Sequence, residues 1–482
     1  MKKVIYSIIF GVALIISSCS DFTDIQPKGK NLLATTDQLE MLLNNKFFYY
    51  IGETDEREMC GDIIRAFENV PTLINRPTKT RNAIIISWDE ANQDKMAELT
   101  SSDSQYSNYY GVIGKISNAI LSHVDAAEGP ESVKNQLKSE ALVLRAYFHY
   151  LLVNKFAKAY NPATAATDPG IPYVTEDWDI SIPTEKATVK EVYDHIIADL
   201  DEAIQLNALP NEAVNRMRIS KPCAYAAKAL ALIGMQKFDE AEVAAKQALA
   251  INNKVNNYNE MLTTTTGYIL GNTYQVIFRP PLKCEEDLFF TFSPELFNAI
   301  TPEAWNAFET GHASRDKMTT DRIMYDYLMG MGTSYIGLDY TFTYDIDSGW
   351  NTIGMKTTQM YLIVAEAEIH KSNYSAAMEA LDAIRINRID PSIYAPLKGV
   401  VSNKTDAIYH LKQTSHGENT YTCHNFINRK RWNQLDDYKQ TFTKNIAGKV
   451  YQLKPESPLW IFPFPVNAVN LNPNLLPQNY KQ

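Results

Sequence analysis

Hydrophobic positions recur at helical spacing over much of the chain. In Gln136–Phe156, the apolar residues fall on one stripe: Leu137, Ala141, Leu144, Phe148, and Leu151 or Leu152. Val189–Leu206 has the same spacing, through Val192, Ile196, Leu200 and Ala203. A shorter pattern in Asp37–Asn45 predicts a helix with Asp37 as its N-cap. These segments are therefore expected to be amphipathic helices that bury one face against a shared core.

Two later segments have the pattern of a repeated unit. Ala224–Asn252 and Tyr361–Arg388 each predict a helix, a short turn and a second helix. Setting Phe238 against Tyr374 brings small residues into register, namely Ala229 with Ala365, Ala231 with Ala367, Ala241 with Ala377, and Ala244 with Ala380. Small residues let paired helices approach closely, which is typical of tetratricopeptide hairpins with their period of about 34 residues. The two helices predicted earlier in the chain can form another such pair, and stacking of pairs is needed to bury their apolar faces.

Between these units the pattern changes. Asn272–Thr358 is rich in Gly, Pro, Thr and aromatic residues and has little helical periodicity, and Ser87–Ser107 is also expected to be irregular. Loops held by a rigid scaffold commonly carry function. The predicted fold is mostly α, with tetratricopeptide-like helix pairs in a single large domain and long loop-rich insertions. The scaffold is expected at residues 137–254 and 357–390, and the ligand-loop insertion at residues 260–356.

The first nineteen residues have the organisation of a secretory signal. Lys2 and Lys3 are followed by the apolar run Val4–Ile16, which is shorter than the ~20 residues of a membrane-spanning helix. Ile16-Ser17-Ser18-Cys19 resembles a bacterial lipobox, which implies a signal peptide over residues 1–18 and acylation of Cys19. Acyl chains hold a protein at the membrane by burying methylene groups, each worth about 0.8 kcal/mol. The acidic stretch 20–26 resembles a surface-export signal of Bacteroidetes lipoproteins.

The composition excludes some classes of partner. The formal net charge is -10, and no basic stripe runs along the chain, which argues against nucleic-acid binding. Besides Cys19 there are four cysteines without a CxxC pair, and their spacing leaves their pairing open: Cys60, Cys223, Cys284 and Cys423.

Six motifs in order resemble the SusD/RagB family over nearly the whole mature chain, residues 19–482. They are Lys138–Asn154 (KSEALVLRAYFHYLLVN), Gly170–Pro172 (GIP), Thr188–Ile204 (TVKEVYDHIIADLDEAI), Arg218–Ala231 (RISKPCAYAAKALA), Thr357–Ala367 (TTQMYLIVAEA) and Leu459–Tyr480 (LWIFPFPVNAVNLNPNLLPQNY). Two segments depart from the family pattern. Asn425–Tyr438 stands where the family often has a longer, Glu-rich helix, and the closing motif lacks a Gly before Tyr480. These departures indicate a divergent branch and leave the ligand open.

The resemblance implies a role in nutrient uptake. A SusD/RagB-like protein is expected to sit as a lid on a SusC-like, TonB-dependent outer-membrane transporter, to capture a nutrient, commonly a glycan, and to pass it to the barrel. The lipid anchor would hold it at the outer membrane, facing the cell surface. Catalysis does not belong to the family. Peptide binding in the same uptake role and a surface glycosidase stay open as alternatives.

Aromatic residues beside amides and carboxylates are the candidate ligand contacts. A sugar presents an apolar face, which suits an aromatic ring, and a hydroxyl edge, which suits planar polar groups. Trp88 with Asp89 and Asn92 offers both, and in the family a Trp and a nearby Asn before the first paired helix often contact ligand. The pairing of Trp305 with Asn306 repeats the pattern. Two further candidates are Tyr340 and Trp350. Packing in the core is the competing interpretation for each ring.

Metal-binding and catalytic signals are weak. Asp345 and Asp347 lie in a D-x-D-x-G stretch without the rest of a calcium loop, and His416, Cys423 and His424 lack a fourth zinc ligand. The sequence has no GxSxG, HExxH or P-loop motif. We therefore predict no catalytic residues, no metal and no cofactor.

Overall fold

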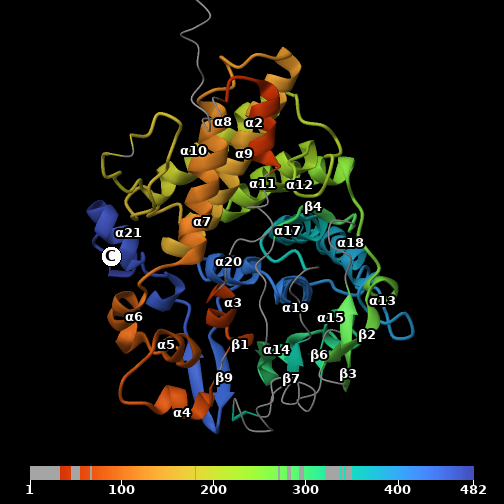
Figure 1. The fold of residues 1–482 in the computed structure, drawn as a ribbon. Coiled ribbons are helices and arrows are strands. Elements are labelled where there is room, and N and C mark those ends of the chain that lie inside the picture. Colours follow the sequence, from red (N-terminus) through yellow and green to blue (C-terminus); the bar gives the residue numbers. More distant parts are fainter. Residues whose placement is uncertain are drawn as a thin grey trace, which may run out of the picture.

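The computed structural model describes most of the chain after residue 32 (Figure 1). The described residues are 33–44, 55–65, 68–179, 181–269, 272–278, 284–291, 298–317, 319–320, 337–338, 341–343 and 350–481. The predicted signal peptide and Cys19, and the residues Tyr340, Asp345 and Asp347, lie outside this part of the chain.

Two long helices open the helical scaffold. They are α9 (Glu131–Phe156) and α10 (Val189–Gln205), and they pack against each other as the sequence predicts. The start of α10 is fixed by a capping box, in which the Thr188 side chain accepts from the Glu191 N–H while Glu191 binds back to the N–H of Thr188. Helix α2 (Thr36–Leu43) corrects the prediction for its cap: the N-cap is Thr35, whose hydroxyl accepts from the Gln38 N–H, and Asp37 lies in the first turn.

The predicted repeat is confirmed in backbone detail. Its helices are α11 (Lys221–Gly234), α12 (Phe238–Ile251), α17 (Thr357–His370) and α18 (Tyr374–Arg385). Gln236 and Ser372, which are equivalent in the alignment of Phe238 with Tyr374, both have φ near +60° (61° and 60°). Each turn closes with the same two bonds, namely Gln236 N–H to Ile233 O and Lys237 N–H to Leu232 O in the first, and Ser372 N–H to Ile369 O and Asn373 N–H to Glu368 O in the second. This is a Schellman motif in both copies.

The helix pairs stack into one scaffold with a continuous core. α10 contacts α11, α12 contacts α17, and α17 and α18 both contact α19 (Lys404–Asn419), which is followed by α20 (Cys423–Trp432). Side chains from all of these pairs belong to a single apolar cluster. In Figure 1, α9 to α12 lie above α17, and α19 and α20 lie below it near the middle of the view. The prediction of a mostly α fold built on tetratricopeptide-like pairs is confirmed.

Short helices make up much of the rest of the described chain. They are α3 (Asp55–Met59), α4 (Val70–Asn75), α5 (Arg81–Ser87), η2 (Glu90–Asn92), α6 (Gln93–Leu99), α7 (Ser104–Val112), η3 (Ile113–Asn118), α8 (Ala119–Leu121), α13 (Tyr258–Met261), α14 (Pro302–Ala307), α15 (Ala313–Asp316), η4 (Pro458–Trp460), α21 (Val466–Leu471), η5 (Pro473–Leu475) and η6 (Asn479–Lys481). The expectation that Ser87–Ser107 is irregular was wrong. Helix α6 buries Gln93 and Met96 on one face, and α7 begins at Ser104 with Asp103 as its N-cap.

The strands are short and antiparallel. One sheet has the order β1-β5-β7-β6, and the other strands form three pairs, β9 with β10, β2 with β3, and β4 with β8. Their bounds are β1 (Ile63–Arg65), β2 (Thr263–Ile269), β3 (Asn272–Phe278), β4 (Asp287–Phe289), β5 (Asn298–Ile300), β6 (Thr319–Thr320), β7 (Thr341–Thr343), β8 (Met355–Lys356), β9 (Phe442–Ile446) and β10 (Lys449–Leu453). Most of them come from the region predicted to be loop-rich, so that region contains a small β layer.

The end of the chain returns to the start of the scaffold. The Phe462 N–H donates to Lys155 O at 3.0 Å, and the Asn479 amide donates to Phe156 O and Gly170 O, both at 2.7 Å. The closing motif therefore fastens the C-terminus to the last turn of α9. No helix in the described ranges is both long enough and apolar enough to cross a bilayer. The thiols of Cys60, Cys223 and Cys423 are buried and form no disulfide.

Candidate functional site

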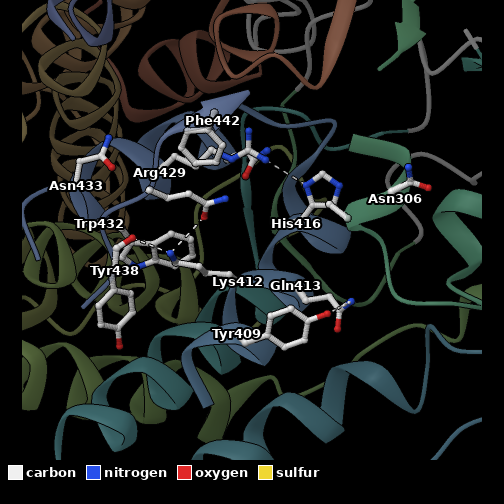
Figure 2. Close-up of a pocket in the computed structure, with 13 residues that line it drawn as sticks. Asn306, Tyr409, Lys412, Gln413, His416, Arg429, Trp432, Asn433, Tyr438 and Phe442 are labelled. Atoms are coloured by element: carbon white, nitrogen blue, oxygen red, sulfur yellow. Dashed lines mark hydrogen bonds between the residues drawn. The ribbon is translucent and has the colours of Figure 1, made fainter. Parts of the chain in front are cut away.

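A pocket of about 280 Å³ lies where α19, α20, α14 and the start of β9 meet (Figure 2). Its lining contains polar amides and aromatic rings in nearly equal number. It is formed by Asn306, Ala307, Tyr409, Lys412, Gln413, His416, Asn425, Arg429, Trp432, Asn433, Tyr438, Gln440 and Phe442. The described residues of this lining include no Asp or Glu. The pocket thus combines ring faces with hydrogen-bonding edges in one recess.

One wall of the pocket is a single face of α19. Tyr409, Lys412, Gln413 and His416 stand at positions i, i+3, i+4 and i+7, which share one side of a helix. The start of this helix is fixed by Asn403, whose side chain accepts from the Asp406 N–H at 3.0 Å. Figure 2 shows Tyr409 and Gln413 together on one side of the pocket, with Phe442 and Arg429 across from them.

The opposite wall is a face of α20 and its C-cap, Asn433. Asn425, Arg429, Trp432 and Asn433 line the pocket from this side. Arg429 is held in place, because its guanidinium donates to Cys60 O and to Asp62 Oδ1, both at 2.9 Å, and lies 4.5 Å from the centre of the Phe442 ring. Asn425 donates to the other oxygen of Asp62. Asp62, which precedes β1 and does not line the pocket, therefore balances the charge of Arg429.

His416 joins α19 to α14. Its Nε2 lies 2.8 Å from Ala304 O, and its Nδ1 faces the Arg429 guanidinium at 3.3 Å. Burial lowers the pKa of His416 to about 4, so the ring is neutral at pH 7. A neutral ring that donates through Nε2 and accepts at Nδ1 satisfies both contacts. This fixes α14, and with it Asn306, at the edge of the pocket.

The groups that solvent can reach suit a carbohydrate. The Tyr409 ring is 59% exposed, Phe442 is half-buried, and Asn306 and Gln440 are exposed, while Gln413 is half-buried. An exposed ring can stack on the C–H face of a sugar, and the amides can donate to and accept from its hydroxyls. The arrangement provides for binding and orientation. Hydrolysis of a glycosidic bond needs two carboxyl groups across the bond, and the described lining supplies none.

Of the residues predicted from sequence, Asn306 reaches this pocket. It is exposed on α14, and the neighbouring Trp305 is partly buried beside it, with the guanidinium carbon of Arg315 at 5.4 Å from its ring. This geometry does not test the prediction that Trp305 and Asn306 contact ligand. It does show a pocket at Asn306 in which a ligand could make such a contact.

Two further predicted rings, Trp88 and Trp350, lie in the interior. Trp88 is 5% exposed, and its indole N–H donates to Met59 O at 2.8 Å. Trp350 is 4% exposed and packs against Tyr258 and Tyr421, with ring centres at 5.6 and 5.9 Å. Asp89 and Asn92 are half-buried and hydrogen-bonded to each other at 2.8 Å. None of these four lines the pocket, and their predicted role in ligand binding stays a prediction.

Sequence reasoning missed the α19 and α20 walls. The available signal was the helical spacing of Tyr409, Lys412, Gln413 and His416, which puts an aromatic and three polar side chains on one face. The sequence instead groups His416 with Cys423 and His424 as candidate zinc ligands. In the structure the two histidines face different carbonyl oxygens: His424 Nε2 faces Gly354 O at 3.0 Å, and His416 Nε2 faces Ala304 O at 2.8 Å. Within the described residues no group of three or more His, Cys, Asp or Glu side chains can hold a metal.

Comparison with known proteins finds a family match over part of the chain. Residues 62–231 match the SusD-like family, described as starch-binding and associating with the outer membrane. A search of curated protein sequences finds no match.

Solved structures share the whole fold at low sequence identity. A SusD superfamily protein from Bacteroides thetaiotaomicron has 16% identity and a TM-score of 0.63, covering 91% of this chain and 98% of its own. Surface glycan-binding protein A from Bacteroides uniformis has 14% identity and a TM-score of 0.64, covering 92% of this chain and 100% of its own. A SusD-like carbohydrate binding protein from Bacteroides vulgatus has 15% identity and a TM-score of 0.58, covering 92% and 98%. The resemblance predicted from six motifs is thus confirmed by sequence over residues 62–231, and the chain shares its fold with solved SusD-like structures over nine-tenths of its length.

Proposed function

We propose that this protein binds a glycan in the pocket between α19 and α20. The observation that carries the proposal is the exposed Tyr409 ring beside the amide of Gln413, in a recess of about 280 Å³ that Asn306 also lines. Such a volume is near the lower end of small-molecule sites, so it suits one or two sugar rings of a longer chain. The open rim leaves the rest of an oligosaccharide free to follow the surface, where Trp305 is the nearest predicted contact.

The family supports a role in uptake. The matching family is described as starch-binding and associated with the outer membrane, and one structural neighbour is named a surface glycan-binding protein. We therefore propose that the bound glycan is passed to a SusC-like, TonB-dependent transporter. The predicted acylation of Cys19 would tether the protein to the outer membrane on the cell surface. The mass of the mature N-terminal peptide, which should carry acyl chains on Cys19, tests this tether.

Two alternatives make different demands on the site. A peptide ligand in the same uptake role would need backbone donors and acceptors along an extended groove, whereas the described pocket offers side-chain amides and rings. A surface glycosidase would need a carboxylate pair, which is not among the described lining residues. Binding of a glycan without cleavage fits this lining better than either.

Replacing Tyr409 by Ala is expected to weaken glycan binding by about 30-fold, which corresponds to the ~2 kcal/mol commonly lost when a well-placed aromatic contact is truncated. Calorimetry against a panel of neutral and acidic polysaccharides and of peptides would first identify a ligand, and would then compare the variant with wild type. Because Tyr409 is largely exposed, its replacement should leave the melting temperature nearly unchanged.

Trp178→Ala is the matched control, because Trp178 is an exposed aromatic (43%) outside the pocket. It should bind the glycan as wild type does. Binding of peptides alone would favour the first alternative. Release of reducing ends from a bound polysaccharide would favour the second.

A further inference from the structure

The charge of the pocket differs from that of the protein as a whole. The chain carries a formal net charge of -10, yet the described lining contains the cations Lys412 and Arg429 and no carboxylate. Asp62 already neutralises Arg429, through the 2.9 Å ion pair between Nη2 and Oδ1. The surplus positive charge therefore belongs to Lys412.

Lys412 is placed to meet an anion. Its ammonium donates to Tyr438 O at 2.7 Å and to Gln440 Oε1 at 3.3 Å, both neutral oxygens. Within the described part of the chain, no Asp or Glu forms an ion pair with it. An ammonium has three donors, so two contacts leave one N–H for a ligand oxygen. The side chain is half-buried, which weakens the screening of its charge by water.

The groups around Lys412 do not neutralise it. On its own helix His416 is neutral, since burial lowers its pKa to about 4, and on the facing wall the charge of Arg429 is balanced by Asp62. Burial raises the pKa of Tyr438, so that phenol is also neutral. The remaining charged groups nearby are engaged in pairs: Lys404 with Asp437, Lys439 with Asp436, Arg431 with Glu366, and Arg385 with Glu309.

We infer that the pocket selects an acidic sugar, one that carries a carboxylate or sulfate group, and that Lys412 binds this anionic group. The inference rests on the proposed glycan-binding function and names its ligand class. Tyr409 stacks on the sugar ring, the amides of Gln413 and Asn306 meet its hydroxyls, and the ammonium of Lys412 meets the anion. Arg429, paired with Asp62, sets the position of the facing wall.

The test compares matched ligands. Polygalacturonate, alginate and hyaluronan are each measured by calorimetry against their carboxyl-reduced forms, which keep the backbone and lose the charge, and dextran sulfate is compared with dextran. At least one acidic polymer is expected to bind the full-length protein about 10- to 100-fold more tightly than its neutral partner, the range of a charge-assisted hydrogen bond. Comparing the three carboxylated polymers with dextran sulfate shows whether the site binds a carboxylate or a sulfate group.

Substitution of Lys412 assigns the preference to this residue. Lys412→Met should abolish the preference for the acidic form while leaving affinity for the neutral form within about threefold, a difference below 1 kcal/mol. Lys412→Arg should retain the preference, and the retained affinity of Lys412→Met for the neutral form shows that the Met variant still folds. Lys115→Met, which removes one exposed charge on η3 outside the pocket, should behave as wild type.

A pH series gives an independent readout. Burial and, to a smaller extent, the nearby Arg429 lower the pKa of Lys412 to about 8. An anion binds the protonated form, so affinity for the acidic polymer should be full at pH 6 and fall as pH rises through 8, whereas Lys412→Met should give a flat profile.

Equal binding of acidic and neutral forms, or a preference that survives in Lys412→Met, would overturn the inference. Neutral glycans that bind and need Tyr409 would leave the proposed function standing, whereas no binding of any glycan would remove both.

Discussion

Replacing Glu418 by Gln is expected to lower the free energy of unfolding by about 3–5 kcal/mol, the usual cost of removing one partner of a buried ion pair. Glu418 is buried at the end of α19, where it accepts from Arg388 Nε at 2.5 Å and lies 3.6 Å from Lys356 Nζ. Arg388 is itself fully buried and also pairs with Glu286 at 2.9 Å. Two cations and two carboxylates thus balance in the core, and the substitution leaves a buried positive charge without its partner.

The Glu418 carboxylate also makes the free energy of unfolding depend on pH. Burial alone would raise the pKa of Glu418, but Arg388 and Lys356 outweigh it and hold the pKa at about 2. Since the folded pKa lies below the unfolded value of about 4.5, this contribution is complete above pH 4.5 and is lost as pH falls toward 2. Denaturant unfolding at pH 7 and pH 3 should show that Glu418→Gln differs from wild type less at the lower pH.

Glu379→Gln on α18 is the matched control, because Glu379 is 63% exposed and pairs with Lys398 at the surface. Its effect on stability should stay below about 1 kcal/mol. An unchanged unfolding midpoint in Glu418→Gln would show that the buried network does not hold α19 against its neighbours.

Trp88→Ala is expected to lower the free energy of unfolding by about 3–5 kcal/mol, as for other buried Trp residues truncated to Ala. The ring follows α5 in a left-handed backbone conformation (φ 48°) and lies under Lys444 Nζ, 3.8 Å from the ring centre. Gly61 packs so closely that a Cβ there would lie 2.4 Å from the indole. Loss of the ring would open a cavity and leave Met59 O without its 2.8 Å donor.

Trp88→Phe separates the ring from its hydrogen bond. It keeps most of the apolar volume and should cost about 1–2 kcal/mol, so thermal unfolding should rank the three proteins as wild type, Phe and Ala. Glycan affinity measured well below the melting temperature tests the ligand contact that sequence predicts for Trp88. If Trp88→Ala had the melting temperature of the wild type, the Trp88 ring would not contribute to the core as described.

The scaffold was predictable because its signal is local. The spacing of apolar residues in Gln136–Phe156 and the alignment of Phe238 with Tyr374 depend only on neighbours along the chain, and the equivalent Schellman turns at Gln236 and Ser372 follow from the same repeat. The helices within Ser87–Ser107 were missed because α6 is short and its polar Gln93 is buried by bonds to Pro458 O and Ile461 O, which lie far along the chain.

The site was less predictable because it is assembled from distant segments. Asn306 is brought to the face of α19 by the contact of His416 with Ala304 O, and Arg429 is placed by Asp62, more than three hundred residues earlier. The sequence pattern of a Trp beside a planar polar residue is the same whether the Trp packs in the core or binds a ligand. Trp88 and Trp350 are buried for reasons that no local pattern contains, while Tyr409 is exposed without any neighbouring motif.

The most direct test of glycan binding in this pocket is a crystal structure of the protein with the oligosaccharide that calorimetry identifies. The account predicts a sugar ring stacked on Tyr409, with hydroxyls within hydrogen-bonding distance of Gln413 or Asn306. A sugar bound elsewhere on the surface, with the recess between α19 and α20 left to solvent, would contradict it.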